Sequence, residues 1–378
     1  MFDWTEKKKK TWLERFTEQP HQLFFGFAII WSILIMFLSQ FIFISGSGDF
    51  SQIHSFGIIY GVFANAFLGF LFTVIPRYTQ SILIKSKKYI TIFIVYQIAI
   101  FAFLFINHDI GKFLVSIALI SSSVIFAQTI KQGRNKTQNE SWWLTFLVLI
   151  GGFLPILEFF AGINLAIFSL WLFVFPLVYV VTQRMVPAFF SVYFKENVTE
   201  KPIWNLPIYV SLFFVIGIFW ENKTIVSIFS FVLFGAICYF AYNAKIFRKA
   251  IPILNILSIA VAWLVVGIFT IFVESIFQIE NLKLGLHILV LGFVLTLLIG
   301  FGTRVILGHS GRKLETDKVT IIIFIITQIV IITRIGTSLY FVIDTNWVGF
   351  IHFAFLLWAI LFIIWGLKYG AILFRTKE

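Results

Sequence analysis

Residues 287–312 read HILVLGFVLTLLIGFGTRVILGHSGR, an apolar stretch that carries a histidine at each end. Between His287 and His309 the run is interrupted only by small residues, two threonines and Arg304. The step of 22 residues between the histidines covers roughly 33 Å of helix, about the thickness of one bilayer hydrocarbon core. The stretch therefore predicts a transmembrane helix that presents its histidines near the two membrane surfaces.

The whole chain is similarly apolar. Of its 378 residues, 60% are hydrophobic and 12% are charged, and the mean hydropathy is +0.98. A soluble domain is about 45–50% apolar and about 25% charged, so the composition indicates an integral membrane protein with little mass outside the bilayer. The single cysteine, Cys238, excludes an intrachain disulfide and a cysteine-ligated iron–sulfur site within one chain.

Apolar runs of at least about 17 residues predict the transmembrane helices. The chain has twelve such runs, so the predicted fold class is all-α, a polytopic integral membrane protein whose residues 1–378 form a single transmembrane domain. To within a few residues we expect the spans at 22–46, 54–77, 89–107, 111–130, 141–160, 163–184, 203–220, 224–244, 251–274, 284–307, 319–343 and 347–373.

Basic residues are unevenly divided between the two sides of this topology. Twenty-five of the 29 lysines and arginines fall on one side, from Lys7–Lys10 to Arg375 and Lys377, and three fall on the other. The positive-inside rule places the basic side, and with it both termini, in the cytoplasm. Loop topology thus explains the net charge of +12, and we expect the lipid bilayer, and no nucleic acid, as a partner.

Small residues predict close helix packing in two spans. Gly57 and Gly61 stand four residues apart in the second span, a spacing that lets helices approach closely. In the tenth span, Gly292, Thr296 and Gly300 recur on one helix face, nearly opposite His287.

The histidines group by predicted depth. Near the outer leaflet, His54 opens the second span, His287 opens the tenth and His352 lies about one turn into the twelfth. Neutral imidazole is the commonest metal ligand and serves both heme iron and copper. Three histidines at one depth form a candidate ligand set where their helices are neighbours, but a histidine at a span end is often only an interfacial residue. The others are His108, in an outer turn, and His21 and His309, at the inner face.

Arginines gather at the inner ends of the spans. Arginines that are presented together can bind carboxylates such as heme propionates through paired hydrogen bonds. Topology and the helix dipole alone also favour basic residues at these positions. Arg304 lies nearly one turn inside the expected boundary, which topology does not explain. The candidates are Arg77, Arg184, Arg304 and Arg312, the last within Gly-His-Ser-Gly-Arg.

Ionisable residues inside spans are functional candidates by default. Arg334 falls near the middle of the eleventh span, whereas Glu158 and Glu274 fall near the outer ends of the fifth and ninth. A buried arginine needs a partner or a water-filled cavity. The difference in depth argues against simple pairing of Arg334 with either glutamate.

Four segments together resemble the NnrS family, in the same order along the chain. Residues 54–57 (HSFG) with 69–79 (GFLFTVIPRYT) are similar to its His, Phe-Gly and Gly-Phe-Leu-Leu-Thr-Ala-x-Pro-Asn-Trp-Thr pattern. Residues 184–190 (RMVPAFF) are similar to Arg-x-x-Pro-x-Phe, and 357–362 (LWAILF) resembles its C-terminal helix. The stretch 287–312 is similar to His-Ala-Leu-x-x-Gly followed by Ser-Arg-Val-x-Leu-Gly-His-Thr-Gly-Arg, the most specific of these motifs. Departures are Arg77-Tyr78 for Asn-Trp, and Ser258 where the family has a histidine before Ala-Trp.

The resemblance implies a bacterial inner-membrane protein that contains b-type heme and copper and acts in the response to nitric oxide and nitrosative stress. His54 and His287, which lie within these motifs, are the first candidate heme ligands, and His352, which the motifs do not place, stands behind them. The resemblance also makes His309, with Arg304 and Arg312, a candidate second site for a metal or for heme propionates.

Our leading hypothesis is therefore a heme protein that binds or reduces nitric oxide, with the quinone pool or another redox donor as the electron source. The sequence leaves open whether the protein is an enzyme. One alternative is a transporter whose pathway uses Arg334 and the glutamates, although no repeated halves are evident. Another is an assembly factor that passes heme or copper to a terminal reductase.

Overall fold

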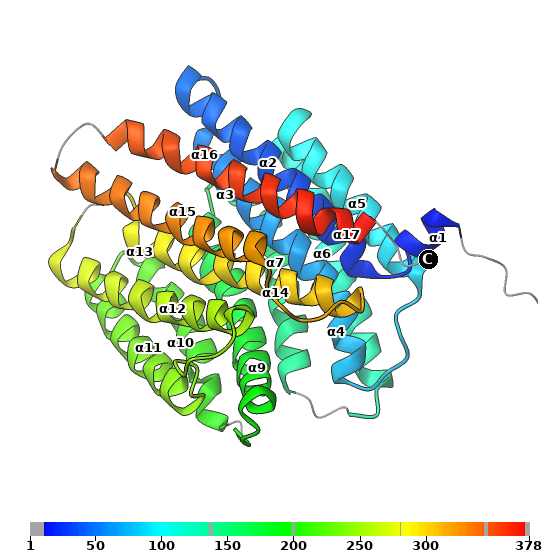
Figure 1. Ribbon diagram of the computed structural model, residues 1–378. Helices are drawn as coiled ribbons and strands as arrows, with labels where there is room; N and C mark the ends of the chain where they lie inside the picture. The colour runs from blue at the N-terminus through cyan, green and yellow to red at the C-terminus, as the bar shows by residue number, and fades with distance from the viewer. Residues whose placement is uncertain (1–10, 136–138, 199–200, 280, 344–346, 375–378) are drawn as a thin grey trace, which may run out of the picture.

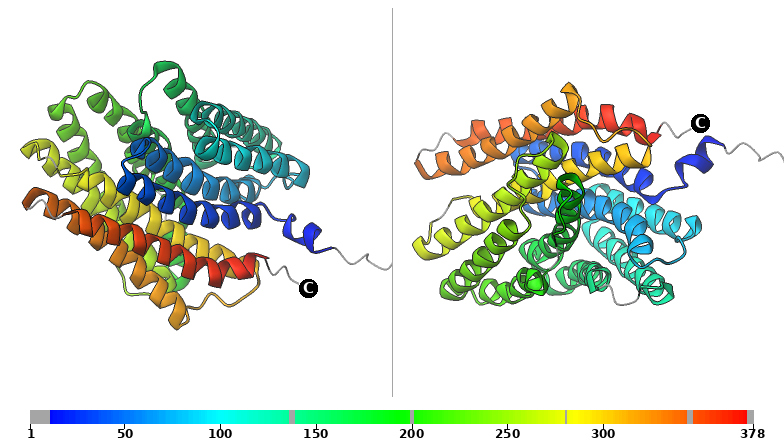
Figure 2. Two further views of the ribbon diagram at one scale, coloured as in Figure 1. Left: turned by 90° about the horizontal axis from the view of Figure 1, so that it is seen from above. Right: turned by 60° about the horizontal axis from the view of Figure 1, so that its bottom comes forward.

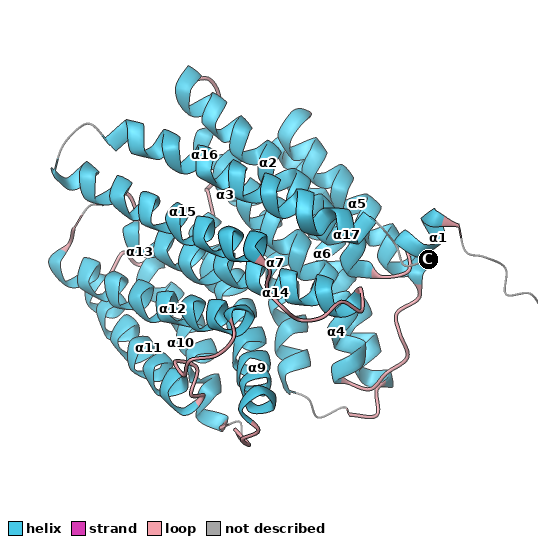
Figure 3. Ribbon diagram, viewed as in Figure 1, coloured by secondary structure: helices cyan, strands magenta, loops and turns pink. Residues whose placement is uncertain are grey.

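The computed structural model describes residues 11–135, 139–198, 201–279, 281–343 and 347–374. Over these ranges the secondary structure is helical, without a strand (Figure 3). Twelve of the helices are long and apolar enough to cross a membrane. The prediction of an all-α polytopic membrane protein is confirmed.

The spans follow one another through short connections, and several consist of consecutive helical segments. A short helix, α1 (Trp12–Phe16), precedes them. In order they are α2 (Pro20–Ser45); α3 (Phe50–Phe56), η1 (Gly57–Ala64) and α4 (Asn65–Tyr78); α5 (Ser86–Phe105); α6 (His108–Gln132); α7 (Asn139–Ala161); α8 (Ala166–Ser169), η2 (Leu170–Val174) and α9 (Phe175–Phe194); η3 (Pro202–Asn205) and α10 (Leu206–Phe219); α11 (Lys223–Asn243); α12 (Pro252–Phe277); α13 (Leu284–His287), η4 (Ile288–Leu295) and α14 (Thr296–His309); α15 (Lys318–Ile343); and α16 (Val348–Trp365), η6 (Gly366–Gly370) and α17 (Ala371–Phe374).

The sixth span differs most from its expected range. It continues to Phe194, whereas the apolar run ends at 184. The polar residues that end the run have partners in the structure: Gln183 donates to Oδ1 of Asn205 at 2.8 Å, and Arg184 pairs with Glu140 at 3.3 Å. Because these contacts give both side chains a polar partner, the helix extends beyond the apolar segment.

Three spans form the centre of the bundle. In the most apolar window of the second span 94% of the residues are buried, and the values for the sixth and tenth spans are 78% and 72%, against 28% for α11. Each of these three central spans contains a π-helical segment, namely η1, η2 and η4. π-Helical turns are rare and occur frequently at functional sites, because they change the direction of neighbouring side chains.

Glycines allow close contacts with the central spans, as predicted. A Cβ atom added to Gly57 would lie 2.6 Å from Cγ2 of Ile35 in α2. One added to Gly292 would lie 2.6 Å from Cβ of Trp263 in α12. These glycines therefore set how closely α2 and α12 approach the second and tenth spans.

Both ends of the described chain meet at one end of the bundle, on the right of Figure 1, and the views in Figure 2 agree. Trp12 Nε1 donates to the carbonyl of Phe374 at 2.9 Å. We call this the terminal end and the opposite end, which holds α13, the distal end. Which end faces the cytoplasm stays a prediction, and Lys7, Lys8, Lys9, Lys10, Lys136, Arg375 and Lys377 lie outside the described residues.

Candidate functional site at the distal end

A cavity of about 430 Å³ lies inside the distal end of the bundle, among the first, second, sixth, tenth, eleventh and twelfth spans. We call it the distal cavity. Its volume falls within the range of about 300–1,000 Å³ that is usual for ligand sites. Most of its wall is apolar, and of the described residues no aspartate or glutamate lines it. Its polar and charged side chains are Ser51, His54, Ser55, Asn164, Lys283, His287 and Arg334.

Two central spans bring histidines to this cavity. His54 stands three residues before the first residue of η1, and His287 is the last residue of α13, directly before η4. Both side chains therefore leave their helices where regular α-helix gives way to a π-helical segment. The structure places His54 and His287 on one cavity, which depth alone did not establish.

Hydrogen bonding fixes the proton of His287. Its Nδ1 lies 2.9 Å from the carbonyl oxygen of Lys283. Since a carbonyl oxygen only accepts, Nδ1 carries the proton, and the neutral ring keeps its lone pair on Nε2. Metal-bound histidines usually have this arrangement, with the other ring nitrogen donating to a carbonyl or carboxylate.

Arg334 lies against the same ring. Its Nη2 is 3.2 Å from Nδ1 and 3.4 Å from Nε2 of His287, and it donates to the carbonyl of Leu282 at 2.9 Å. Nη1 donates to Oγ of Ser338 at 2.6 Å. At 3.4 Å the contact with Nε2 is long for a hydrogen bond. A metal at Nε2 could replace it and leave Arg334 with two good partners.

The two intramembrane glutamates have other partners. Glu158 forms an ion pair with Lys112 at 2.9 Å. Glu274 accepts from Asn281 Nδ2 and from the backbone N–H of Gly285, both at 2.8 Å. Arg334 accordingly faces a cavity rather than a carboxylate.

His54 has a ring nitrogen without a partner. Its Nδ1 is buried and makes no hydrogen bond within the part of the chain that the structure describes. The ring stacks on Phe50, with centroids 5.3 Å apart, and meets the edge of Phe355 at 6.2 Å. A buried polar atom normally has a partner, so the imidazole of His54, which lines the cavity, is a candidate ligand.

His352 lies behind the cavity wall. It is not a lining residue, and its ring packs against Phe43 with centroids 5.6 Å apart. Phe43 in turn packs against Phe355, which does line the cavity. Aromatic side chains therefore stand between His352 and the cavity. His108 is elsewhere, stacked on Phe103 at 4.6 Å.

A second histidine pair forms at the terminal end. The rings of His21 and His309 have centroids 4.4 Å apart, and Nη1 of Arg77 lies 3.4 Å from Nε2 of His309. His21 is buried, with Nδ1 unpartnered by any described group. The sequence placed both histidines at one depth but did not predict that they meet.

The predicted arginines have different contacts at this end. Arg304 stacks over Phe189 at 3.9 Å, and Arg184 stacks over Tyr78 at 4.2 Å. The backbone N–H of Arg312 closes the end of α14 on the carbonyl of Leu307. Arg77 is thus the arginine that contacts His309.

The side chains of the distal cavity are of the kinds that could hold a heme. It provides two imidazoles and two cationic side chains, Lys283 and Arg334, without a carboxylate, and heme carries two propionates. Among the described residues, no group of three or more histidine, cysteine, aspartate or glutamate side chains is placed to hold a metal ion. The remaining candidate ligands for copper are His21 and His309, which meet at the terminal end.

Comparison with known proteins gives one family. A protein-family model described as NnrS protein matches residues 15–377, nearly the whole chain. No curated protein matches the chain.

Proposed function

This chain belongs to the NnrS family, which supports a role in the nitric oxide response, and from that premise we propose that it binds b-type heme in the distal cavity. The supporting observation is the composition of that cavity: His54 and His287 with Lys283 and Arg334, and no acidic residue among the described lining. Imidazoles ligate iron and cations pair with propionates. A single heme would therefore account for both the imidazoles and the cationic side chains.

Each protein group has a distinct part in this proposal. Nε2 of His287 and the imidazole of His54 are the candidate ligands, since the first keeps its lone pair and the second lines the cavity with a ring nitrogen that has no described partner. Lys283 and Arg334 bind the propionates. Phe355 and Trp358 in the cavity wall exclude water. His352 is a third candidate ligand, but it packs against Phe43, which in turn packs against Phe355 of the cavity wall.

Heme, when bound, supplies an iron that binds nitric oxide and can pass electrons to it. Turnover needs a redox donor, for which the quinone pool of a bacterial inner membrane is our candidate. We place copper at His21 and His309, because the rings of these two histidines are in contact. The site predicted from the sequence combined His309 with Arg304 and Arg312 instead.

An optical spectrum of the detergent-purified protein tests the proposal, taken oxidised and dithionite-reduced with iron and copper counted per chain. We expect a Soret band and about one iron per chain. Colourless, iron-free protein from cells supplied with heme contradicts the proposal.

Transport is the second candidate function, because a cavity lined by cations and lacking described acids also suits an organic anion. Iron-free protein that mediates anion uptake into proteoliposomes, with uptake lost in Arg334→Ala, would favour it. Substoichiometric and easily lost metal would instead point to an assembly factor.

A further inference from the structure

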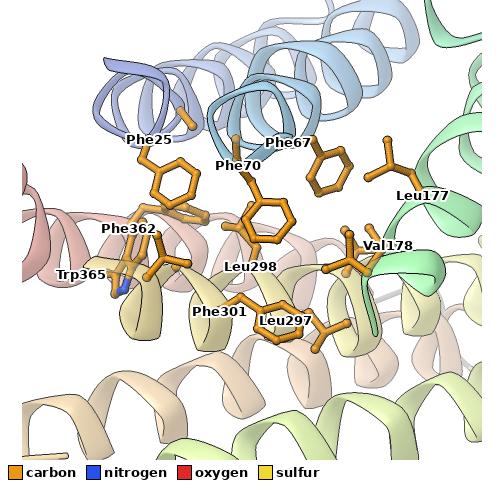
Figure 4. Close-up of a pocket in the computed structure, with 16 residues that line it drawn as sticks. Phe25, Phe67, Phe70, Leu177, Val178, Leu297, Leu298, Phe301, Phe362 and Trp365 are labelled. Carbon is orange, nitrogen blue, oxygen red and sulfur yellow. The ribbon is translucent and has the colours of Figure 1, made fainter. Parts of the chain in front are cut away.

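A second cavity lies between the distal cavity and the terminal end. Figure 4 shows the 16 residues that line it, from α2, α4, α9, η4, α14 and α16. Its volume is about 60 Å³. We call it the midspan cavity, and we propose that it binds a small uncharged gas molecule. The identification of that gas as nitric oxide rests on the proposed function, but the binding site itself does not.

The lining is unsuited to water. All of its side chains are hydrocarbon or glycine except the indole of Trp365. That indole Nε1 already donates to Oγ1 of Thr303 at 3.0 Å. A buried water typically needs two to four hydrogen-bond partners, and cavities lined by Leu, Ile and Phe stay dry and take up apolar molecules such as xenon.

The volume decides which apolar ligand fits. At about 60 Å³ the cavity is far below the usual size of a site for a drug-sized or cofactor-sized ligand, about 300–1,000 Å³. A quinone ring or a lipid chain would have to displace its walls. A diatomic gas or a xenon atom fits without such a change.

The midspan cavity lies next to the cavity that holds the histidines, along the tenth span. Along the tenth span, His287 and Leu291 line the distal cavity, and Val294 and Leu297 line the midspan cavity. Leu291 and Val294 are only three residues apart, about 4.5 Å along a helix. The two cavities therefore follow one another along a central span.

The wall also has a side that is not fully buried. Most lining side chains are buried, but Phe67, Leu298 and Val305 are partly exposed. An apolar gas that dissolves in the bilayer can enter by this side, whereas an ion cannot. We infer that gas reaches the distal cavity through the hydrocarbon region.

Xenon is the probe for the test, because it is apolar, of the right size and located by anomalous diffraction. In crystals of the full chain under xenon pressure, we expect a xenon atom between Phe70 and Leu297. Ala28→Val and Ala66→Val fill the cavity and should abolish this peak. Ala262→Val is the matched control, since Ala262 lies on α12 outside both described cavities and should keep it.

Absence of xenon from the wild-type cavity, or its retention there in both filled variants, overturns the inference. If the filled variants fail to fold, the wild-type xenon position decides alone. The result is separable from heme binding: xenon in an iron-free protein refutes the heme proposal and supports the cavity. Heme in a protein that takes up no xenon here supports the heme proposal and refutes the gas cavity.

Discussion

Nη2 of Arg334 in α15 lies 3.2 Å from Nδ1 of His287 in α13, at the wall of the distal cavity. Substituting Arg334 therefore tests whether its charge acts on a cofactor held there. A nearby positive charge disfavours ferric iron, which carries one charge more than ferrous iron. We expect Arg334→Gln to lower the reduction potential of the heme by tens of millivolts, measured by spectroelectrochemical titration.

Arg334→Lys is the matched control, because it keeps the charge and loses the planar group that bonds Leu282 and Ser338. It should retain most of the wild-type potential. Equal shifts in the two variants would assign the effect to packing rather than charge.

Histidine substitutions test the ligand assignment. His54→Ala and His287→Ala each remove an imidazole from the distal cavity, and each should reduce heme occupancy at least about 10-fold, read from the Soret absorbance per chain. His108→Ala is the control, since His108 stacks on Phe103 away from the cavity and should leave the spectrum unchanged. Retention of full absorbance in both cavity variants would sink the assignment.

The sequence predicted the spans well and their neighbours poorly. Hydropathy located all twelve spans, because burial in lipid requires long apolar helices. Depth does not fix rotation about the helix axis. His54 and His352 share a depth, yet one lines the cavity while aromatic side chains separate the other from it.

Contacts between distant helices had no local signal. Arg334 was recognised as a residue in need of a cavity, but its contact with His287 arises from the packing of α15 beside α13. The meeting of His21 with His309 likewise depends on packing between the first and tenth spans. The π-helical segments beside His54 and His287 also went unpredicted, since the apolar pattern does not distinguish them from α-helix.

Asp317 predicts a pH dependence outside the membrane. A hydrogen bond from Lys368, followed by those from Thr320, lowers the pKa of Asp317 to about 2, below the usual value of an aspartate. A lowered folded-state pKa stabilises the protein above the unfolded pKa, and this contribution is lost as the pH falls from about 4 toward 2. Because Asp317 is largely exposed, we expect less than about 1 kcal/mol.

The measurement is the thermal unfolding midpoint of wild type and Asp317→Asn in detergent. Wild type should unfold slightly higher at pH 6, and the difference should shrink as the solution is acidified below pH 4. A difference that grows on acidification would contradict the assignment.

Gly292 predicts a steric limit between the tenth span and α12. A Cβ atom there would lie 2.6 Å from Cβ and Cγ of Trp263, so Gly292→Ala must move one helix. Overpacking of this kind typically costs about 1–3 kcal/mol, which should appear as a lower midpoint in thermal unfolding. Gly235→Ala is the control, since a Cβ at Gly235 meets no atom within 4 Å. Equal midpoints for the two variants would show that the contact relaxes without cost.

The ion pair between Lys112 and Glu158 predicts strong coupling inside the bundle. The charged atoms are 2.9 Å apart, both side chains are buried, and Glu158 also accepts the backbone N–H of Leu165 at 3.1 Å. Removing one partner leaves an uncompensated buried charge, which typically costs about 3–5 kcal/mol. Lys112→Met and Glu158→Gln should each lower the unfolding midpoint strongly, whereas the double variant should lose much less than the sum of the two. A double-mutant cycle measures this difference. Additive losses would mean that the two charges act independently and that water or lipid headgroups solvate each of them.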